Sequence, residues 1–328
     1  MTGLLDRLRS GERRALAQAI TLAESTRPDH RAEAEALLAA LRPDSGPHGG
    51  KAFRLGLSGP PGVGKSTFIE AFGLLLLEQG HRVAVLAVDP SSQVTGGSIL
   101  GDKTRMEKLA QDPRAFIRPS PAGRTLGGVA RRTHDALLLV EAAGFDVAIV
   151  ETVGVGQSET AVADLVDCFC LLLPPAGGDE LQGLKKGVVE LCDLAVINKA
   201  DGALQAAAGR AAAEYQSALR LLRPASARWV PPVLQVSALE GRGLDEVWAT
   251  VQRFRAALGP AGLAAKRARQ ARAWLWRELQ EGLAEAFRAH PAVAAALPAV
   301  EAEVAAGTLS PSAAAARLLA LFGGKGEP

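Results

Sequence analysis

Residues 56–67 read GLSGPPGVGKST, and this stretch decides the fold. It carries the pattern Gly-x4-Gly-Lys-Ser between a predicted strand at 54–58 and a predicted helix at 65–79. Glycines let the backbone N–H groups of such a loop turn toward phosphate oxygens, and the following helix adds the positive end of its dipole. This strand–loop–helix context is the one that a phosphate-binding loop requires. We therefore predict that the loop contacts a nucleotide through Gly59, Pro60, Pro61, Gly62, Val63, Gly64, Lys65, Ser66 and Thr67.

Two side chains of this loop have predicted chemical roles. Lys65 should reach the β- and γ-phosphates, which makes it a candidate catalytic residue. The Ser66 hydroxyl should ligate a magnesium ion. The alternative interpretation is a glycine-rich turn with a solvated lysine.

Short apolar segments alternate with helical ones after this loop. The runs VAVLAV, VAIV and LAVIN are continuous rather than alternating, which is typical of strands covered on both faces in the parallel sheet of an α/β domain. Helices fill the gaps, for example at 127–143. We predict an α/β P-loop domain with a mostly parallel central sheet, whose strands lie at 54–58, 82–89, 116–119, 146–151, 167–173, 194–198 and 233–237.

Helical segments flank the predicted P-loop domain, which we assign to residues 46–258. Residues 1–45 are predicted to be an N-terminal helical extension, with two helices between about Ser10 and Leu41 that separate at Pro28. Residues 259–328 are predicted to be a C-terminal helical arm. Its last helix should begin at Ser310 and Pro311, an N-cap residue followed by proline at the first helical position.

The arm carries an apolar stripe at helical spacing, formed by Trp276, Leu279, Leu283 and Phe287. A segment of this length cannot bury a core alone, so the stripe must pack on another surface. Packing on the same chain and packing on a second copy of the chain both remain open at this point.

Composition excludes several classes of protein. The chain has 328 residues, 48% of them hydrophobic and 22% charged, with a formal net charge of +2, so it is expected to be globular rather than disordered. This small charge gives no argument for nucleic acid or a membrane surface as a partner. No uninterrupted apolar run approaches the roughly 18 residues that span a bilayer. The first residues resemble neither a secretory signal nor a transit peptide, and the expected location is the cytoplasm.

Three cysteines, Cys168, Cys170 and Cys192, are too few and too close for a disulfide framework. We interpret them as small buried hydrophobic residues in a reducing compartment. A metal relay is the alternative, but neither a paired CxxC nor a histidine-rich tract supports it.

The segment NKAD places Asn198, Lys199 and Asp201 at the end of the next-to-last predicted strand. In a P-loop domain an aspartate here accepts hydrogen bonds from guanine N1–H and N2–H2, a pair of donors that adenine lacks. NKAD alone could be any polar strand exit, but its position strengthens the motif. The residues after the last strand, Ser237, Ala238 and Leu239, match a second guanine-side loop. We therefore predict that the chain binds GTP and GDP.

Carboxylates after two other strands are candidates for the magnesium side of the site. Asp89 could hold the ion through water, or it could form a turn before a proline. Asp102 could reach an attacking water or cap a helix. Glu151 ends a buried strand, and Gly154 follows at the spacing where a backbone N–H senses the γ-phosphate. We favour a metal-side and catalytic role for Glu151 over a purely structural one.

At this point the sequence resembles a known family. The segments GLSGPPGVGKST, VLAVDPSSQVTGGSILGDKTRM, VETVGVGQSE, GGDELQGLKKG and NKADG are similar to the G-protein chaperones of adenosylcobalamin-dependent acyl-CoA mutases, of the MeaB, MMAA and ArgK type. The resemblance spans residues 11–258.

The resemblance implies a GTPase that binds methylmalonyl-CoA mutase or a related acyl-CoA mutase, gates loading of adenosylcobalamin and protects or reactivates the enzyme. It implies Asp89 and Glu151 in the outer shell of Mg²⁺, Asp102 in the catalytic or switch region, and a homodimer through the C-terminal helices. It also implies a loop at 177–186 that relays partner binding, with the candidate switch residues Asp179, Glu180, Gln182 and Lys185.

The sequence differs from some relatives of this family in two features, and one other function competes with the GTPase regulator. The P-loop lacks the additional N-terminal lysine that some dimer-activated relatives insert across their interface. The five histidines do not cluster, which argues against a nickel-chaperone relative. A P-loop phosphotransferase, a kinase acting on a small acceptor, is the competing function. It would need an acceptor pocket and a base, and the sequence identifies neither.

Overall fold

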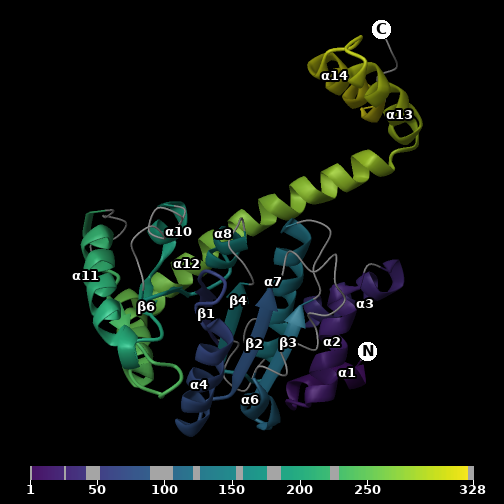
Figure 1. Cartoon of the computed structure of the whole chain (residues 1–328). Coiled ribbons are helices and arrows are strands. Elements are labelled where there is room, and N and C mark those ends of the chain that lie inside the picture. The colour runs from purple at the N-terminus through teal and green to yellow at the C-terminus, as the bar shows by residue number, and fades with distance from the viewer. Residues whose placement is uncertain are drawn as a thin grey trace. The chain divides into compact units, whose positions relative to one another are not determined.

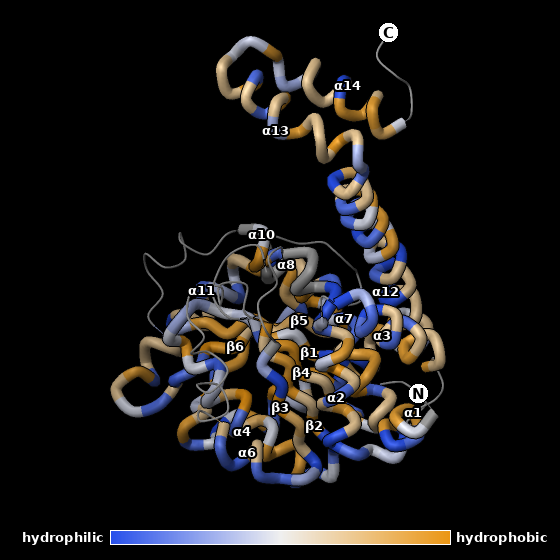
Figure 2. The backbone as a smooth tube through the Cα atoms, turned by 90° about the vertical axis from the view of Figure 1, so that its right-hand side faces the viewer, coloured by the Kyte–Doolittle hydropathy of each residue, from blue (hydrophilic) through white to orange (hydrophobic). Residues whose placement is uncertain are grey.

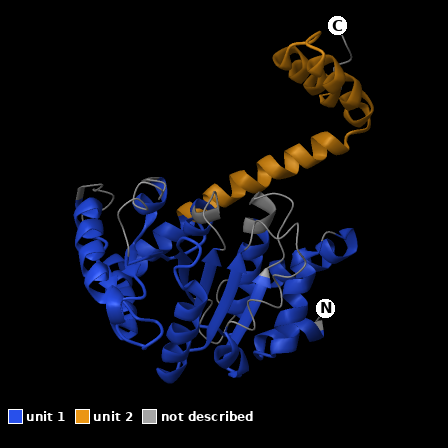
Figure 3. Ribbon diagram, in the orientation of Figure 1, with its two compact units in different colours: residues 1–268 blue, residues 269–328 orange. Residues whose placement is uncertain are grey.

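The computed structural model describes residues 2–25, 27–41, 52–88, 106–120, 126–152, 158–175, 186–221 and 229–323 (Figure 1). The chain divides into two compact units, residues 1–268 and 269–328, which Figure 3 distinguishes by colour. The first unit holds the sheet and the predicted phosphate loop. No helix among the described residues is both long and apolar enough to cross a membrane.

A seven-stranded sheet forms the centre of the first unit. Its strand order is β3-β2-β4-β1-β5-β6-β7, and every pair of neighbouring strands is parallel. The predicted α/β class is therefore correct. The strands are β1 (Phe53–Ser58), β2 (Val83–Val88), β3 (Ala115–Ser120), β4 (Val147–Thr152), β5 (Cys168–Leu173), β6 (Leu194–Ile197) and β7 (Val233–Gln235).

Both faces of the sheet are covered, which explains the continuous apolar runs. Alternate side chains such as Leu55 share one core cluster with α4 (Lys65–Glu78), α6 (Glu107–Gln111) and the start of α12 (Leu244–Ala289). The opposite face contacts α7 (Leu126–Ala142) and α8 (Ser158–Ala163). Figure 2 shows the hydrophobic colour concentrated on the central strands. This unit also contains α10 (Lys186–Leu191), η1 (Gly202–Leu204) and α11 (Gln205–Leu221), and α11 contacts β6 and β7.

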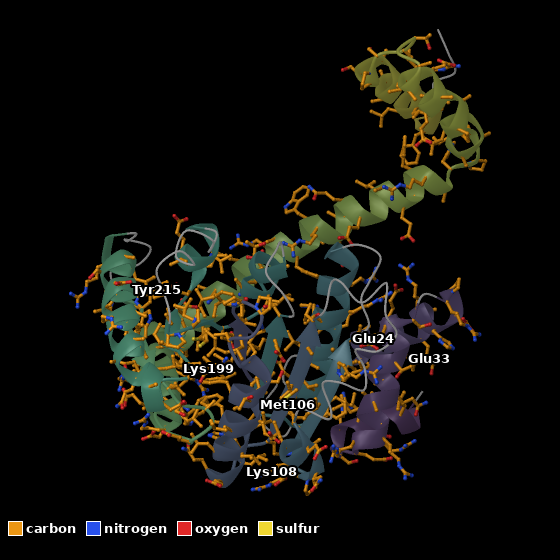
Figure 4. The ribbon with its side chains drawn as sticks, in the orientation of Figure 1. Glu24, Glu33, Met106, Lys108, Lys199 and Tyr215 are labelled. Carbon is orange, nitrogen blue, oxygen red and sulfur yellow. The ribbon has the colours of Figure 1, made fainter. Side chains whose placement is uncertain are left out.

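Three N-terminal helices belong to the same compact unit as the sheet. They are α1 (Thr2–Arg9), α2 (Arg13–Glu24) and α3 (Pro28–Ala40), and all three contact α7. Arg118 of β3 donates to the buried carboxylate of Glu24 at 2.6 Å, which joins α2 to the edge strand (Figure 4). The helix break at Pro28 agrees with the sequence prediction. The helical region, however, starts before the predicted Ser10, since α1 covers Thr2–Arg9 and was not among the predicted helices.

The second unit contains the end of α12, α13 (Pro291–Ala305) and α14 (Pro311–Phe322). Val293 and Val300 pack against Ala314 and Leu318 in a small core of their own. Ser310 caps α14 by accepting a hydrogen bond from the backbone N–H of Ala313 at 3.3 Å, as predicted. The sequence GPAG lies inside α12, where Gly259 leaves helical geometry with φ 65° and ψ 173°.

Candidate nucleotide-binding site

The predicted site residues gather at one edge of the sheet. In a parallel sheet all strands end on the same side, and ligands of such folds bind there. The P-loop follows β1, and Glu151 lies at the end of β4. The NKAD segment (residues 198–201) follows β6, and the SAL segment (residues 237–239) follows β7. Because β4 and β1 are neighbours and β5, β6 and β7 come next, these segments emerge along one continuous edge.

The P-loop is held in shape by close approaches that only glycine permits. A Cβ on Gly59 would lie 2.4 Å from the carbonyl oxygen of Leu172. Gly64 has φ +92°, and a Cβ there would lie 2.8 Å from Nδ2 of Asn198. Both positions therefore exclude any side chain, so the glycines shape the loop as well as freeing its N–H groups.

The side chains of the loop agree with a phosphate site. Lys65 Nζ donates to the carbonyl oxygens of Gly59 and Pro60, at 2.8 and 3.2 Å, so the ammonium group is positioned within the loop. Ser66 is partly buried in the first turn of α4, while Thr67 is exposed. An ammonium group and the start of a 14-residue helix provide positive charge and N–H donors at one place.

The NKAD segment is fastened directly to the P-loop. Asn198 Nδ2 donates to the carbonyl oxygen of Val63 at 2.9 Å, and Asn198 Oδ1 accepts from the N–H of Ala238 at 3.3 Å. Lys199, labelled in Figure 4, donates to the carbonyl oxygen of Gly62 at 2.7 Å. Its backbone has φ 59°, a left-handed conformation uncommon for lysine. The phosphate loop and the two predicted base loops therefore form one connected structure.

Asp201 is oriented by the loop that follows β7. The Ser237 hydroxyl donates to Asp201 Oδ2 at 2.5 Å and accepts from the N–H of Glu240 at 3.1 Å. Ser237 and Ala238 are buried, whereas the side chain of Leu239 is 82% exposed. The predicted contact residues of this loop thus divide into two that build the loop and one that faces solvent.

One residue of this region was missed by the sequence analysis. The guanidinium of Arg242 donates to the carbonyl oxygen of Ala200, and its backbone pairs with Ser237. The sequence feature that could have pointed to Arg242 is the segment GRG at residues 241–243, between SAL and the following helix. In the structure both of its glycines have positive φ.

Glu151 occupies the buried end of β4, with 4% of its surface exposed. Its backbone lies between Leu57 of β1 and Ala87 of β2 in the sheet register. Strand alternation puts Glu151 on the same sheet face as Ile149, which packs in the core cluster with α4. The next residue, Thr152, faces the other way and donates to Ser58 Oγ at 2.8 Å. Glu151 is thus on the side of the sheet that carries the P-loop helix.

The oxygen donors at this edge fit a hard divalent cation. A serine hydroxyl and a carboxylate, with water completing the shell, are ligands that Mg²⁺ accepts. Ser66 and Glu151 are the described members of that set. Groups of three or more histidine, cysteine, aspartate or glutamate side chains suited to a metal are absent from the described part of the chain.

Several predicted site residues lie outside the described residues. They are Asp89, Asp102 and Gly154 on the magnesium side, and Asp179, Glu180, Gln182 and Lys185 of the predicted switch loop.

Comparisons with known proteins agree with this geometry. The chain is 53% identical over 328 residues to "Methylmalonic aciduria type A homolog, mitochondrial" of Mus musculus, covering 98% of this chain and 78% of that protein. It is 54% identical over 276 residues to "GTPase ArgK" of Escherichia coli (strain K12), covering 84% and 82% respectively. A solved structure, "Crystal structure of LAO/AO transport system kinase", matches with a TM-score of 0.77 and 42% identity, covering 98% of this chain and 97% of that one.

A family model described as "Methylmalonyl Co-A mutase-associated GTPase MeaB" matches residues 16–292. That match covers most of the chain, including the P-loop, the NKAD segment and the loop after β7. The chain is a P-loop GTPase and belongs to the Methylmalonyl Co-A mutase-associated GTPase MeaB family.

Proposed function

We propose that this GTPase binds an adenosylcobalamin-dependent acyl-CoA mutase, most directly methylmalonyl-CoA mutase, and gates the loading of adenosylcobalamin. In the same role it protects or reactivates the mutase. The support for this client is the description of the family, which names association with methylmalonyl-CoA mutase. The support for a nucleotide-controlled output is one structural observation. Asn198 and Lys199 tie the base-side loop to the P-loop through the carbonyl oxygens of Val63 and Gly62.

The proposed chemistry of the site assigns one task to each group. Lys65 compensates charge on the β- and γ-phosphates, and backbone N–H groups at the start of α4 bind phosphate oxygens. The Asp201 carboxylate accepts hydrogen bonds from guanine N1–H and N2–H2. Ser66 would hold Mg²⁺ directly, with Asp89 and Glu151 in its outer shell. When bound, the ion neutralises charge that develops on the phosphates.

The remaining proposed roles concern the switch. Gly154 would donate a backbone N–H to the γ-phosphate, and Asp102 would act beside the attacking water or in the switch region. Loss of the γ-phosphate would then release the loop that carries Gly154. The loop at 177–186, with Asp179 and Lys185, would pass that change to the mutase.

We also propose a homodimer formed through the C-terminal helices. Within the second unit, Trp276, Leu279 and Leu283 are 67%, 44% and 60% exposed. Exposed large apolar residues at helical spacing commonly mark an interaction surface. Phe287, the fourth residue of the predicted stripe, packs instead against the small core of α13 and α14.

The deciding experiment measures association with purified methylmalonyl-CoA mutase. The chain is mixed with the mutase in the presence of GDP or of a non-hydrolysable GTP analogue, and the complex is quantified by analytical ultracentrifugation. We expect the amount of complex to depend on the nucleotide. The matched control is Asp201→Asn, which should lose this dependence because it no longer binds guanine well.

Two results would overturn the proposal. Equal association in both nucleotide states, or none in either, removes the mutase-regulator function. Stoichiometric transfer of phosphate from GTP to an amino acid or sugar would favour the kinase alternative instead.

A further inference from the structure

The two loops that follow β6 and β7 are joined by a closed circuit of hydrogen bonds. Ser237 Oγ bonds to Asp201 Oδ2, and the backbone of Ser237 pairs with that of Arg242 in both directions at 3.0 Å. The guanidinium of Arg242 donates to the carbonyl oxygen of Ala200 at 2.5 Å. Ala200 directly precedes Asp201, so the circuit closes through the peptide bond between these two residues.

The backbone part of this circuit depends on the glycine after Arg242. Gly243 has φ +81°, and a Cβ there would lie 2.6 Å from the carbonyl oxygen of Gln235. Glycine at this position therefore lets the returning chain lie directly against the end of β7, where Arg242 pairs with Ser237. This backbone arrangement fixes the position of the Arg242 Cα atom, from which the side chain extends toward Ala200.

The side-chain part of the circuit acts on the peptide bond in front of Asp201. Ala200 is buried, and its N–H donates to the carbonyl oxygen of Val236 at 3.0 Å. With its carbonyl held by Arg242, the residue is fixed at both polar groups. The plane of the Ala200–Asp201 peptide sets the direction in which the Asp201 side chain leaves the backbone.

We propose that Arg242 is a positioning residue for guanine recognition. It orients the Asp201 carboxylate so that both guanine donors, N1–H and N2–H2, reach it together. Arg242 itself is not proposed to touch the nucleotide. The inference rests on the proposed role of Asp201 as the guanine acceptor. A base with a single donor at this edge needs less accurate placement of the carboxylate, so the effect of Arg242 should depend on the base.

The test compares the affinities of GDP and inosine diphosphate, which lacks the 2-amino group, by isothermal titration. Arg242→Met keeps the length of the side chain and removes its donors. We expect it to weaken GDP binding about tenfold, which corresponds to the loss of one hydrogen bond from guanine to the charged Asp201 carboxylate, and to weaken inosine diphosphate binding less than about threefold. Arg242→Lys retains one charged donor and should restore part of the preference for GDP.

The matched control is Arg253→Met. Arg253 is also a partly exposed arginine of this region and pairs with Glu246 at 2.6 Å, but that contact lies within α12. We expect the ratio of the two affinities to equal that of the wild-type chain. The ratio does not depend on the fraction of folded protein, so a partly unfolded variant remains informative.

Equal losses for GDP and inosine diphosphate in Arg242→Met would overturn the inference, because they would indicate general damage to the loop. An unchanged GDP affinity would overturn it as well. The Asp201→Asn variant shows which part of the argument fails: the positioning role of Arg242, or the role of Asp201 as the guanine acceptor. It should weaken GDP binding and improve binding of xanthosine diphosphate, whose 2-oxo group accepts a hydrogen bond from the new amide. If Asp201→Asn leaves GDP affinity unchanged, the assignment itself is wrong, whatever Arg242→Met does.

Discussion

At the scale of single residues, two buried carboxylates, Glu151 and Glu141, lie in different surroundings. Glu151 lies at the end of β4 where the site residues gather. Glu141 lies on α7 and accepts a 2.7 Å bond from Arg54, near the beginning of β1. Burying a carboxylate is unfavourable without compensating contacts. For Glu141 the compensation includes an ion pair with Arg54. The position of Glu151, at the end of β4, suits the proposed role beside a hydrated cation.

The first prediction concerns substitution of Glu151 by glutamine, which keeps the shape and removes the charge. We expect Mg²⁺-dependent GTP hydrolysis to fall at least about tenfold, equivalent to roughly 1.4 kcal/mol of transition-state stabilisation. Thermal stability should change little. Single-turnover hydrolysis at several Mg²⁺ concentrations, together with the melting temperature, measures both quantities.

Glu141→Gln is the matched control for this prediction. It leaves the buried guanidinium of Arg54 without its charged partner and should cost about 3–5 kcal/mol of folding free energy. Hydrolysis per folded molecule should stay at the wild-type rate. If Glu151→Gln instead lowers the melting temperature and leaves hydrolysis intact, Glu151 is a structural strand-end residue.

At the scale of elements, β5 carries two cysteines in a strand buried on both faces. Cys168, Cys170 and Cys192 are free and buried, as the sequence analysis predicted. Burial raises the pKa of the Cys168 and Cys170 thiols, with a smaller contribution from nearby Asp193 at Cys168 and from Cys192 at Cys170. Because the thiolate is the reactive form, such thiols are inert in the folded protein.

The second prediction follows from that protection. At pH 8 the native chain should react with Ellman's reagent only as fast as it unfolds, while all three thiols should react promptly in guanidinium chloride. GDP should slow the native reaction further, because a ligand of the folded state reduces the unfolded fraction. A thiol that reacts within seconds in the native chain would contradict this account of β5.

Some helices and strands of the fold could be predicted from the sequence, and others could not. Continuous apolar runs located the strands because both sheet faces are covered. The end of β7 differs from the predicted range of 233–237. There, Ser237 leaves the sheet and pairs with Arg242, a partner that apolar patterning does not encode. A short helix such as α1 depends on tertiary contacts for its stability, and its weak local pattern did not predict it.

The candidate site was predictable where a motif dictates local geometry. Gly59, Lys65, Asn198 and Asp201 were predicted from motif spacing, and the structure brings them to one edge of the sheet. The order of the strands was not predictable, since it depends on which crossover connections pack best. Arg242 was missed for a related reason. Its role comes from a carbonyl 42 residues away in the sequence, and only the folded chain brings the two together.

At the scale of the whole molecule, the second unit presents more apolar surface than its own small core covers. Val293, Val300, Ala314 and Leu318 form that core, yet Trp276 and Leu283 of α12 are mostly exposed. A tryptophan at the centre of an interface commonly contributes much of the binding free energy. The proposed homodimer would bury this stripe against the same stripe of a second copy, as a two-fold interface requires.

The last prediction tests that stripe with two separate variants, each of which introduces one aspartate on α12. Trp276→Asp should convert the chain from a dimer to a monomer of 34.0 kDa, measured by light scattering after size exclusion at micromolar concentration. Ala271→Asp introduces the same charge at another exposed residue, about 140° around the helix from Trp276 at 3.6 residues per turn. It should leave the dimer intact. A wild-type monomer, or equal disruption by both variants, would contradict the proposed interface. A monomeric Trp276→Asp chain that still binds GDP with wild-type affinity would further indicate that each subunit completes its own nucleotide site, as expected from a P-loop without the additional lysine.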